Sequence, residues 1–226
     1  MLTAKLILER LDKEHRLLER REIPSRSFVM GFIKLLYVAH AQIQSGAPYS
    51  MNDITNTPRN IDSQSIETNY KGTLKVGSAP GASEHFVLGG VRYSGGGTPN
   101  TILIEGEKLG IVVGTGVAAV TPTDIALGTR IVHGRAAGQL EYGGCELVGI
   151  TFSDPNGQFT IRRYFTNNSG GAITVQEAGI YAAGTLYLVN MLGSSWPFCI
   201  ARDLTGAVAV ANTELLRVTY VVQITV

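Results

Sequence analysis

The segments FTIRRYFTNNSGGAITVQEAGIYA (159–182) and LLRVTYVVQITV (215–226) carry the clearest strand pattern of this chain. In the second segment the apolar residues of one parity form a continuous row: Leu216, Val218, Tyr220, Val222, Ile224 and Val226. A period of two places such a row on one face of a β-strand. The two segments therefore predict a mainly β protein whose last strand is held in a sheet.

The first segment is interrupted by the run NNSGG at residues 167–171. Asn and Gly tolerate positive φ angles, so this run is typical of a tight turn. Apolar alternation precedes the run and resumes after it, at Ile173 and Val175. We therefore expect residues 159–166 and 173–180 to pair as a β-hairpin.

Composition sets limits on the class of protein. Charged residues make up only 16% of the 226 residues, below the usual share of about 25%. The net charge of +1 gives no electrostatic basis for binding nucleic acid or an anionic membrane. The longest apolar run, at 28–41, is too short to cross a bilayer, so we expect no membrane insertion. Cys145 and Cys199 lack metal-ligand spacing and are expected to be buried thiols.

Charge is unevenly distributed along the chain. Twelve charged residues lie within residues 1–26, whereas Glu177 is the only one between Arg163 and Arg202. Such a charge-poor stretch favours burial, either against other subunits or in a large core of the monomer. Both explanations remain open from the sequence.

The N-terminal region, residues 1–43, contains two elements. Residues 3–25 fit either a charged helix or a hairpin with its turn at 12–15, because both periods occur. A Ser before Phe28 can cap a following amphipathic helix of about 27–42. Its apolar stripe includes Phe28, Phe32 and Leu36, so we expect the helix to lie against a sheet or another subunit.

The remaining chain divides into two further regions. Residues 44–107 are rich in Gly, Ser and Pro and form either a loop region or a small β insertion, with strand-like stretches at 73–76, 85–93 and 101–105. Residues 108–226 are expected to form the core. The fold class we predict is an antiparallel β-sandwich, jelly-roll-like or Ig-like, with the one N-terminal helix.

The run GTGVAA at 114–119 follows the apolar residues 111–113 and imitates a dinucleotide-binding glycine motif. That chemistry needs a helix whose N-terminus meets the pyrophosphate. The run TPTD at 121–124 stops any such helix within a few residues. We therefore expect turns in a β protein and no cofactor.

No catalytic constellation is apparent. The histidines at 15, 40, 85 and 133 are scattered, and Asp124, Asp154 and Asp203 lack the alternating oxygen ligands of a calcium loop. Acids such as Glu177 cannot be paired from sequence and are usually solvent-facing or salt-bridged. We therefore predict no enzyme and no catalytic, cofactor or metal site.

Several segments resemble a family of structural proteins of tailed bacteriophages: residues 111–127, 131–144, 159–182 and 200–226, with EAGIYA resembling a strand motif of tail-fibre and collar-fibre proteins. The stretch REIPSRSFVMGFIKLLY at 21–37 also resembles this family. The resemblance implies a virion structural subunit, made in the host cytoplasm, and an N-terminal hairpin entering a helix. It favours a tail, neck or fibre-associated position over capsid decoration.

The expected partners are further copies of the chain and other virion proteins. The candidate interface residues are aromatic or large apolar side chains of the helix and of the charge-poor stretch: Phe28, Phe32, Leu36, Tyr181, Tyr187, Trp196 and Phe198. An alternative is a carbohydrate-binding β-sandwich used in host attachment, with a host surface glycan bound by Trp196 or by loops between residues 44 and 97.

Overall fold

The structure, a computed structural model, describes residues 2–25, 28–41, 49–64, 71–76, 83–88, 109–188 and 191–225, with side chains described at 3–25, 28–38, 49–59, 109–146, 148–182 and 197–224. These residues form twelve β-strands and one α-helix. The antiparallel strands dominate, so the predicted mainly β fold with a single helix is confirmed. The expected strand at 101–105 lies outside the described residues.

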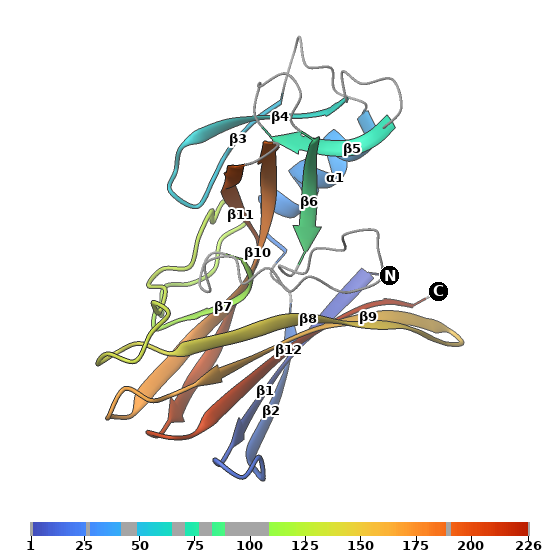
Figure 1. Cartoon of the computed structure of the whole chain (residues 1–226). Helices are drawn as coiled ribbons and strands as arrows, with labels where there is room; N and C mark the ends of the chain where they lie inside the picture. Colours follow the sequence, from blue (N-terminus) through green and yellow to red (C-terminus); the bar gives the residue numbers. More distant parts are fainter. Residues whose placement is uncertain are drawn as a thin grey trace.

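The larger sheet contains both ends of the chain (Figure 1). Its strand order is β2 (Leu17–Ser25), β1 (Leu2–Leu11), β12 (Leu215–Thr225), β9 (Asn156–Thr166) and β8 (Glu141–Ser153). β1 pairs with β12 along its whole length, from Leu2 beside Ile224 to Leu11 beside Leu215. The hairpin alternative for the N-terminal region is thus confirmed, and this hairpin is an integral part of the sheet.

The second sheet is built around β10 (Ile173–Leu188). β11 (Met191–Val210) pairs along one side of it. Along the other side, β7 (Gly110–Gly114) pairs with residues 177–181 and β6 (Ser83–Leu88) with residues 182–187. One long strand therefore collects partners from distant parts of the sequence.

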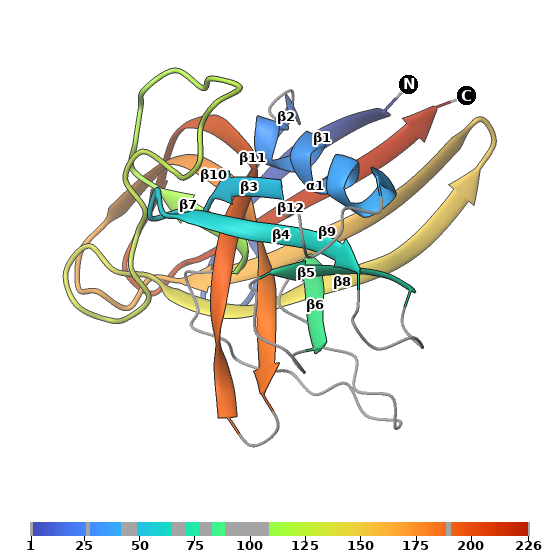
Figure 2. The same ribbon diagram turned by 90° about the horizontal axis from the view of Figure 1, so that it is seen from above.

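A small third sheet and the helix lie at one end of the second sheet (Figures 1 and 2). The sheet consists of β3 (Tyr49–Asn52), β4 (Pro58–Gln64) and β5 (Lys71–Val76). The helix α1 (Met30–Ala41) contacts β11 and all three strands of this sheet. The sequence left open a loop region or a small β insertion at 44–107; the described residues there form the strands β3 to β6, of which β6 belongs to the second sheet.

The core lies between the inner faces of the two larger sheets and is one continuous cluster. Its fully buried members from the first sheet include Leu6, Ile161, Phe165, Leu216 and Tyr220, and those from the second include Val112, Val175, Ile180 and Phe198. The row of residues 216–222 points inward, as its period of two predicts. Ile224, at the end of β12, is 54% exposed. This packing of two antiparallel sheets is the predicted sandwich.

The hairpin expected at residues 159–180 is wrong. β9 pairs with β12 and β8 in the first sheet, whereas β10 belongs to the second. The intervening run 167–172 is an arch that carries the chain from one sheet to the other. Asn167 is fully buried and its Nδ2 donates to the carbonyl oxygens of Gly171 (2.8 Å) and Val210 (2.7 Å). Turn-forming residues reverse the chain in both cases, so composition does not tell a hairpin from an arch.

A second arch, residues 211–214 between β11 and β12, stacks on the first. The backbone N–H of Asn167 donates to the carbonyl oxygen of Glu214 (2.9 Å), and the N–H of Thr213 donates to the carbonyl oxygen of Asn167 (2.6 Å). Each arch thus satisfies backbone groups of the other. The two stacked arches close one end of the sandwich.

The glycine run at 114–119 does not begin a helix. β7 ends at Gly114, and the following residues are irregular. A Cβ atom at Gly114 or Gly116 would collide with the carboxylate of Glu177. These glycines allow the backbone to approach a buried side chain.

Candidate functional site

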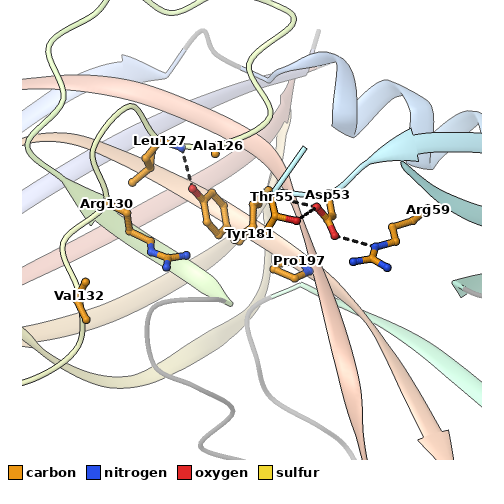
Figure 3. Close-up of a pocket in the computed structure, with 10 residues that line it drawn as sticks. Asp53, Thr55, Arg59, Ala126, Leu127, Arg130, Val132, Tyr181 and Pro197 are labelled. Carbon is orange, nitrogen blue, oxygen red and sulfur yellow. Dashed lines mark hydrogen bonds and ion pairs between the residues drawn. The ribbon is translucent and has the colours of Figure 1, made fainter. Parts of the chain in front are cut away.

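A cavity of about 470 Å³ lies between the β3–β4 turn, the loop after β7 and the second sheet (Figure 3). Its lining comes from three places: Asp53, Ile54, Thr55 and Arg59 around the turn, Ala126, Leu127, Arg130 and Val132 in the loop, and Tyr181 and Pro197 on β10 and β11. The volume and the mixture of apolar walls with a few polar groups are typical of small-molecule sites.

Asp53 forms the charged wall of this cavity and is only 2% exposed. Its Oδ1 accepts hydrogen bonds from Thr55 N–H (2.8 Å), Thr55 Oγ1 (2.6 Å) and Thr57 N–H (3.1 Å), and its Oδ2 accepts one from Arg59 Nε (2.8 Å). Burial alone raises the pKa of this carboxyl, but the bonds from Thr55 and Arg59 outweigh it and hold the pKa below its ordinary value. Asp53 is therefore ionised, and both of its oxygens are engaged within the turn.

Tyr181 brings a phenol to the middle of the cavity (Figure 3). Its hydroxyl oxygen accepts the N–H of Leu127 at 2.7 Å. Burial raises the pKa of Tyr181 well above its ordinary value, so the hydroxyl stays protonated. Within the described part of the chain, no acceptor takes the proton of this hydroxyl.

Arg130 extends its guanidinium into the cavity from the opposite wall (Figure 3). Its backbone is fixed by a bridge between residues 114 and 130. The Nε atom is buried and has no hydrogen-bond partner among the described residues. A buried donor without an acceptor is costly, and no ion pair with a described residue neutralises the charge of this guanidinium.

The loop that carries Arg130 is anchored on Glu177, a fully buried carboxylate of β10. Glu177 Oε1 accepts the N–H groups of Gly116 (3.0 Å) and Thr129 (2.7 Å), and Oε2 accepts the N–H of Gly128 (3.0 Å). One side chain thus holds both ends of the loop. Sequence reasoning left Glu177 as an isolated acid, and the structure gives it a structural role.

Arg202 on β11 completes this network. Its Nε donates to Glu177 Oε2 (2.9 Å), its NH1 to Asp124 Oδ2 (2.7 Å) and its NH2 to the carbonyl oxygen of Ala118 (3.0 Å). Burial lowers the pKa of Arg202, but the bonds to Asp124 and Glu177 raise it further, and the net pKa lies above its ordinary value. The network therefore gives the cavity wall a rigid support.

A second cavity, of about 330 Å³, lies beside α1. It is lined by residues of α1, of β3 and the turn after it, and of the 123–125 loop, together with Cys199. Burial raises the pKa of the Cys199 thiol to about 12. Both cysteines are free and buried, as predicted, and such a thiol is not a reactive nucleophile at neutral pH.

The predicted interface residues separate into three groups. Phe28 and Phe32 are half-buried and stack with ring centroids 4.4 Å apart, and Leu36 is exposed. Tyr181 and Phe198 are buried in the core of the monomer, which is a correction, because inward-facing strand residues cannot form an outer contact. The side chains of Tyr187 and Trp196 lie outside the described residues.

Two apolar surfaces are exposed instead. The α1 stripe consists of Met30, Ile33, Leu36 and Tyr37. The β8 row consists of Ile150 and Phe152, which share one face of the strand, and Phe152 is 84% exposed. Val148 is also exposed but lies on the other face, across a bulge between residues 148 and 150. β8 is an edge strand of the larger sheet, and its hairpin with β9 projects beyond the other strands (Figure 1).

Little in the sequence indicates the cavity. Asp53-Ile54-Thr55-Asn56-Thr57 has the composition of a turn closed by an Asp side chain, but nothing local relates it to Arg130. The described residues contain no group of three or more His, Cys, Asp or Glu that could hold a metal ion. No helix in the described ranges is long and apolar enough to span a membrane.

Comparisons of the chain with protein-family models, with curated proteins and with solved structures find no match. The fold and the cavity are therefore interpreted from their own geometry.

Proposed function

We propose that the chain is a non-enzymatic structural subunit of a tailed-phage virion, which assembles with copies of itself and with other virion proteins. The proposal places it in the tail, neck or fibre, with capsid decoration as the alternative position. The resemblance of residues 111–127, 131–144, 159–182 and 200–226 to phage structural proteins supports the virion. The exposed β8 row is the observation that supports assembly with other subunits.

The β8 row supports assembly because edge strands can pair with other chains unless charge, proline or a covering segment prevents it. In the described part of the chain, β9 is the only strand that pairs with β8. The opposite edge of the sheet, β2, carries Glu19, Arg20, Arg21 and Glu22. The two edges therefore differ in charge: on β2 the charged run follows the exposed Leu17 and Leu18, whereas residues 147–153 of β8 carry no charge.

The α1 stripe supports a second contact. Ile33 is 59% exposed and lies one turn from Met30 and one turn from Tyr37, which are also exposed. A helix that turns apolar side chains both to the sheet and to the outside is typical of elements buried between subunits. The charge-poor stretch 178–199 supports assembly less, because its described side chains at 178–182 and 197–199 lie in the monomer core or line the cavity.

Light scattering on the purified chain tests assembly. We expect the natural chain to form an oligomer at micromolar concentration, and Ile150→Lys with Phe152→Lys to shift it towards the monomer. Val117→Lys is the matched control, because Val117 is 65% exposed on a loop outside both surfaces. A stable monomer of the natural chain at this concentration would contradict the proposal.

The position in the particle needs a separate experiment. Cryo-electron microscopy of intact particles distinguishes a tail, neck or fibre subunit from a capsid decoration protein by where the density of the sandwich repeats. Density on the capsid surface alone would leave only the alternative position.

A second candidate function is carbohydrate binding in host attachment. It is favoured by the cavity, whose Asp53, Thr55 and Arg59 come from the 44–97 region in which glycan contacts are expected. This function and assembly are compatible, since the cavity and the β8 row are formed by different residues.

A further inference from the structure

Two donor groups face the 470 Å³ cavity without acceptors from the described part of the chain. One is the guanidinium of Arg130, which forms no hydrogen bond or ion pair with the described residues (Figure 3). The other is the hydroxyl of Tyr181, which uses its oxygen to accept from Leu127 and keeps a proton to donate. Arg130 and Tyr181 line the same cavity (Figure 3).

The charges that line the cavity leave one positive charge uncompensated. Asp53 and Arg59 form an ion pair at 2.8 Å and cancel. Arg130 has no ion pair with any described residue, and no other described lining residue is charged. A ligand that carries one negative charge therefore matches the site.

The single unpaired positive charge limits which anions fit. A phosphate dianion would bring two negative charges to a cavity in which Arg130 is the one described lining residue whose charge is not paired. A carboxylate brings one charge and presents two oxygens in the plane that an Arg fork recognises. The Tyr181 hydroxyl offers a third donor to the same group.

The rest of the lining suits a small hydroxylated ring. Thr55 and Arg59 place polar groups at the far end of the cavity from Arg130 (Figure 3). Leu127 and Pro197 provide apolar contacts between these ends. Such an alternation of polar ends and apolar walls fits a sugar, which has polar edges and C–H faces.

We propose that this cavity binds a saccharide residue bearing one carboxylate, with the carboxylate on Arg130 and Tyr181 and the ring hydroxyls towards Thr55 and Arg59. The site is not needed for assembly through the β8 row, so either proposal can fail without the other. It gives the carbohydrate-binding function a specific ligand class and a specific location.

Nuclear magnetic resonance on the natural chain tests the ligand and the location together. Glucuronate is titrated into the ¹⁵N-labelled protein, with glucose and inorganic phosphate as parallel probes. We expect glucuronate to shift the amide signals of Thr55, Leu127 and Thr129 and to saturate, while glucose and phosphate bind at least about tenfold more weakly. Saturable binding of glucose or phosphate with equal strength, shifts confined to other regions, or no binding of glucuronate would each overturn the proposal.

The variant Arg130→Gln tests the residue that recognises the carboxylate. It should weaken glucuronate binding about tenfold or more, because a charged hydrogen bond to the ligand is lost. Arg135→Gln is the matched control, since Arg135 lies in the same loop region, is paired with Glu141 and is exposed. Unchanged binding by Arg130→Gln, or equal loss in Arg135→Gln, would contradict the assignment.

The folding of the variant is checked by thermal unfolding. Arg130 makes no hydrogen bond or ion pair with the described residues, so its replacement by Gln should not lower the unfolding temperature. Arg130→Lys provides a second comparison: it keeps the charge and loses the planar fork, and we expect an affinity between those of the natural chain and Arg130→Gln. An Arg130→Lys variant that binds as tightly as the natural chain would contradict recognition by the fork.

Discussion

The buried charges show how single residues hold this sandwich together. Arg163 faces the core between Ile161 and Phe165 and is nearly inaccessible. Its NH1 donates to the carbonyl oxygens of Leu109 (2.7 Å) and Ile111 (2.9 Å), and its Nε donates to Gly143 (2.8 Å). A buried charge is tolerated when its donors are satisfied. Arg163 thus joins β9 to β7 and β8, which no pattern of apolar residues could indicate.

Replacing Glu177 tests how much one buried carboxylate stabilises the fold. Glu177→Ala removes the acceptor of three loop N–H groups and one partner of Arg202, so we expect the free energy of unfolding to fall by about 3–5 kcal/mol. Glu146→Ala is the control, because its pair with Arg162 lies at the surface and should cost less than about 1 kcal/mol. Urea unfolding measures both changes. Equal losses in the two variants would contradict the structural role of Glu177.

Asp124 makes the stability depend on pH. Burial raises its pKa, but hydrogen bonds from Thr121 and Arg202 lower it further, and the net pKa in the folded chain lies below the ordinary value of 3.8. Its contribution is therefore complete above the unfolded pKa of about 4 and is lost as the pH falls through the folded pKa.

We expect Asp124→Asn to reduce the loss of stability between about pH 5 and pH 2, because one carboxyl with a depressed pKa is removed. Urea unfolding at several pH values measures this slope. Glu146→Gln, at an exposed surface pair, is the control and should leave the slope nearly unchanged. A slope for Asp124→Asn equal to that of the natural chain would contradict the assigned shift.

At the scale of elements, the two arches determine how the sheets are connected. Residues 167–172 and 211–214 each carry the chain across the sandwich, and their backbones hydrogen-bond to each other. The side chain of Asn167 bonds to its own arch and to the end of β11: Nδ2 donates to Gly171 and Val210, and Oδ1 accepts from Ser169 N–H (3.1 Å) and Ser169 Oγ (2.7 Å). These bonds connect the β10–β11 pair of the second sheet to the β9–β12 pair of the first sheet at one end of the sandwich.

Asn167→Ala should lower the free energy of unfolding by about 2–4 kcal/mol, since the carbonyl oxygens of Gly171 and Val210 lose their donor. Asn168→Ala is the matched control, because Asn168 is the next residue in the same arch and is exposed. Its side chain bonds only the surface residue Glu141 among the described residues, and we expect a change below about 1 kcal/mol. Chemical denaturation with both variants decides the comparison; a larger loss in Asn168→Ala would contradict it.

At the scale of the whole molecule, the first and last strands are one unit. β1 pairs with β12 along its whole length, and Leu6 and Leu8 of β1 lie in the same core cluster as Tyr220. β2 then presents a charged outer edge. The N-terminal region that composition separates from the core is thus required to cover the final strand.

Removal of residues 1–25 should leave a chain that does not fold as a soluble protein, because the apolar edge of β12 and part of the core become exposed. Expression solubility and circular dichroism measure the outcome. The control is Lys5→Ser with Glu22→Ser, which removes an exposed cross-strand ion pair of the same hairpin and should leave the chain folded and soluble. A truncated chain with a cooperative unfolding transition would contradict the prediction.

The local pattern of the sequence determined the elements. The period of two in residues 215–226, the apolar helix after Phe28 and the lack of any helix after Gly114 all depend on neighbours in the chain, and each was predicted correctly. The β-sandwich class follows from those elements, because strands with one apolar face must bury it against another sheet.

The tertiary structure alone decided the pairing and the cavity. Asn167 reverses the chain in a hairpin and in an arch alike, so the partner of β9 depends on residues some 50 positions away, in β12. The cavity joins Asp53, Arg130 and Tyr181, which no sequence period relates. Local periodicity reports the environment of each side chain along one element, whereas contacts between distant segments depend on how all the elements pack together.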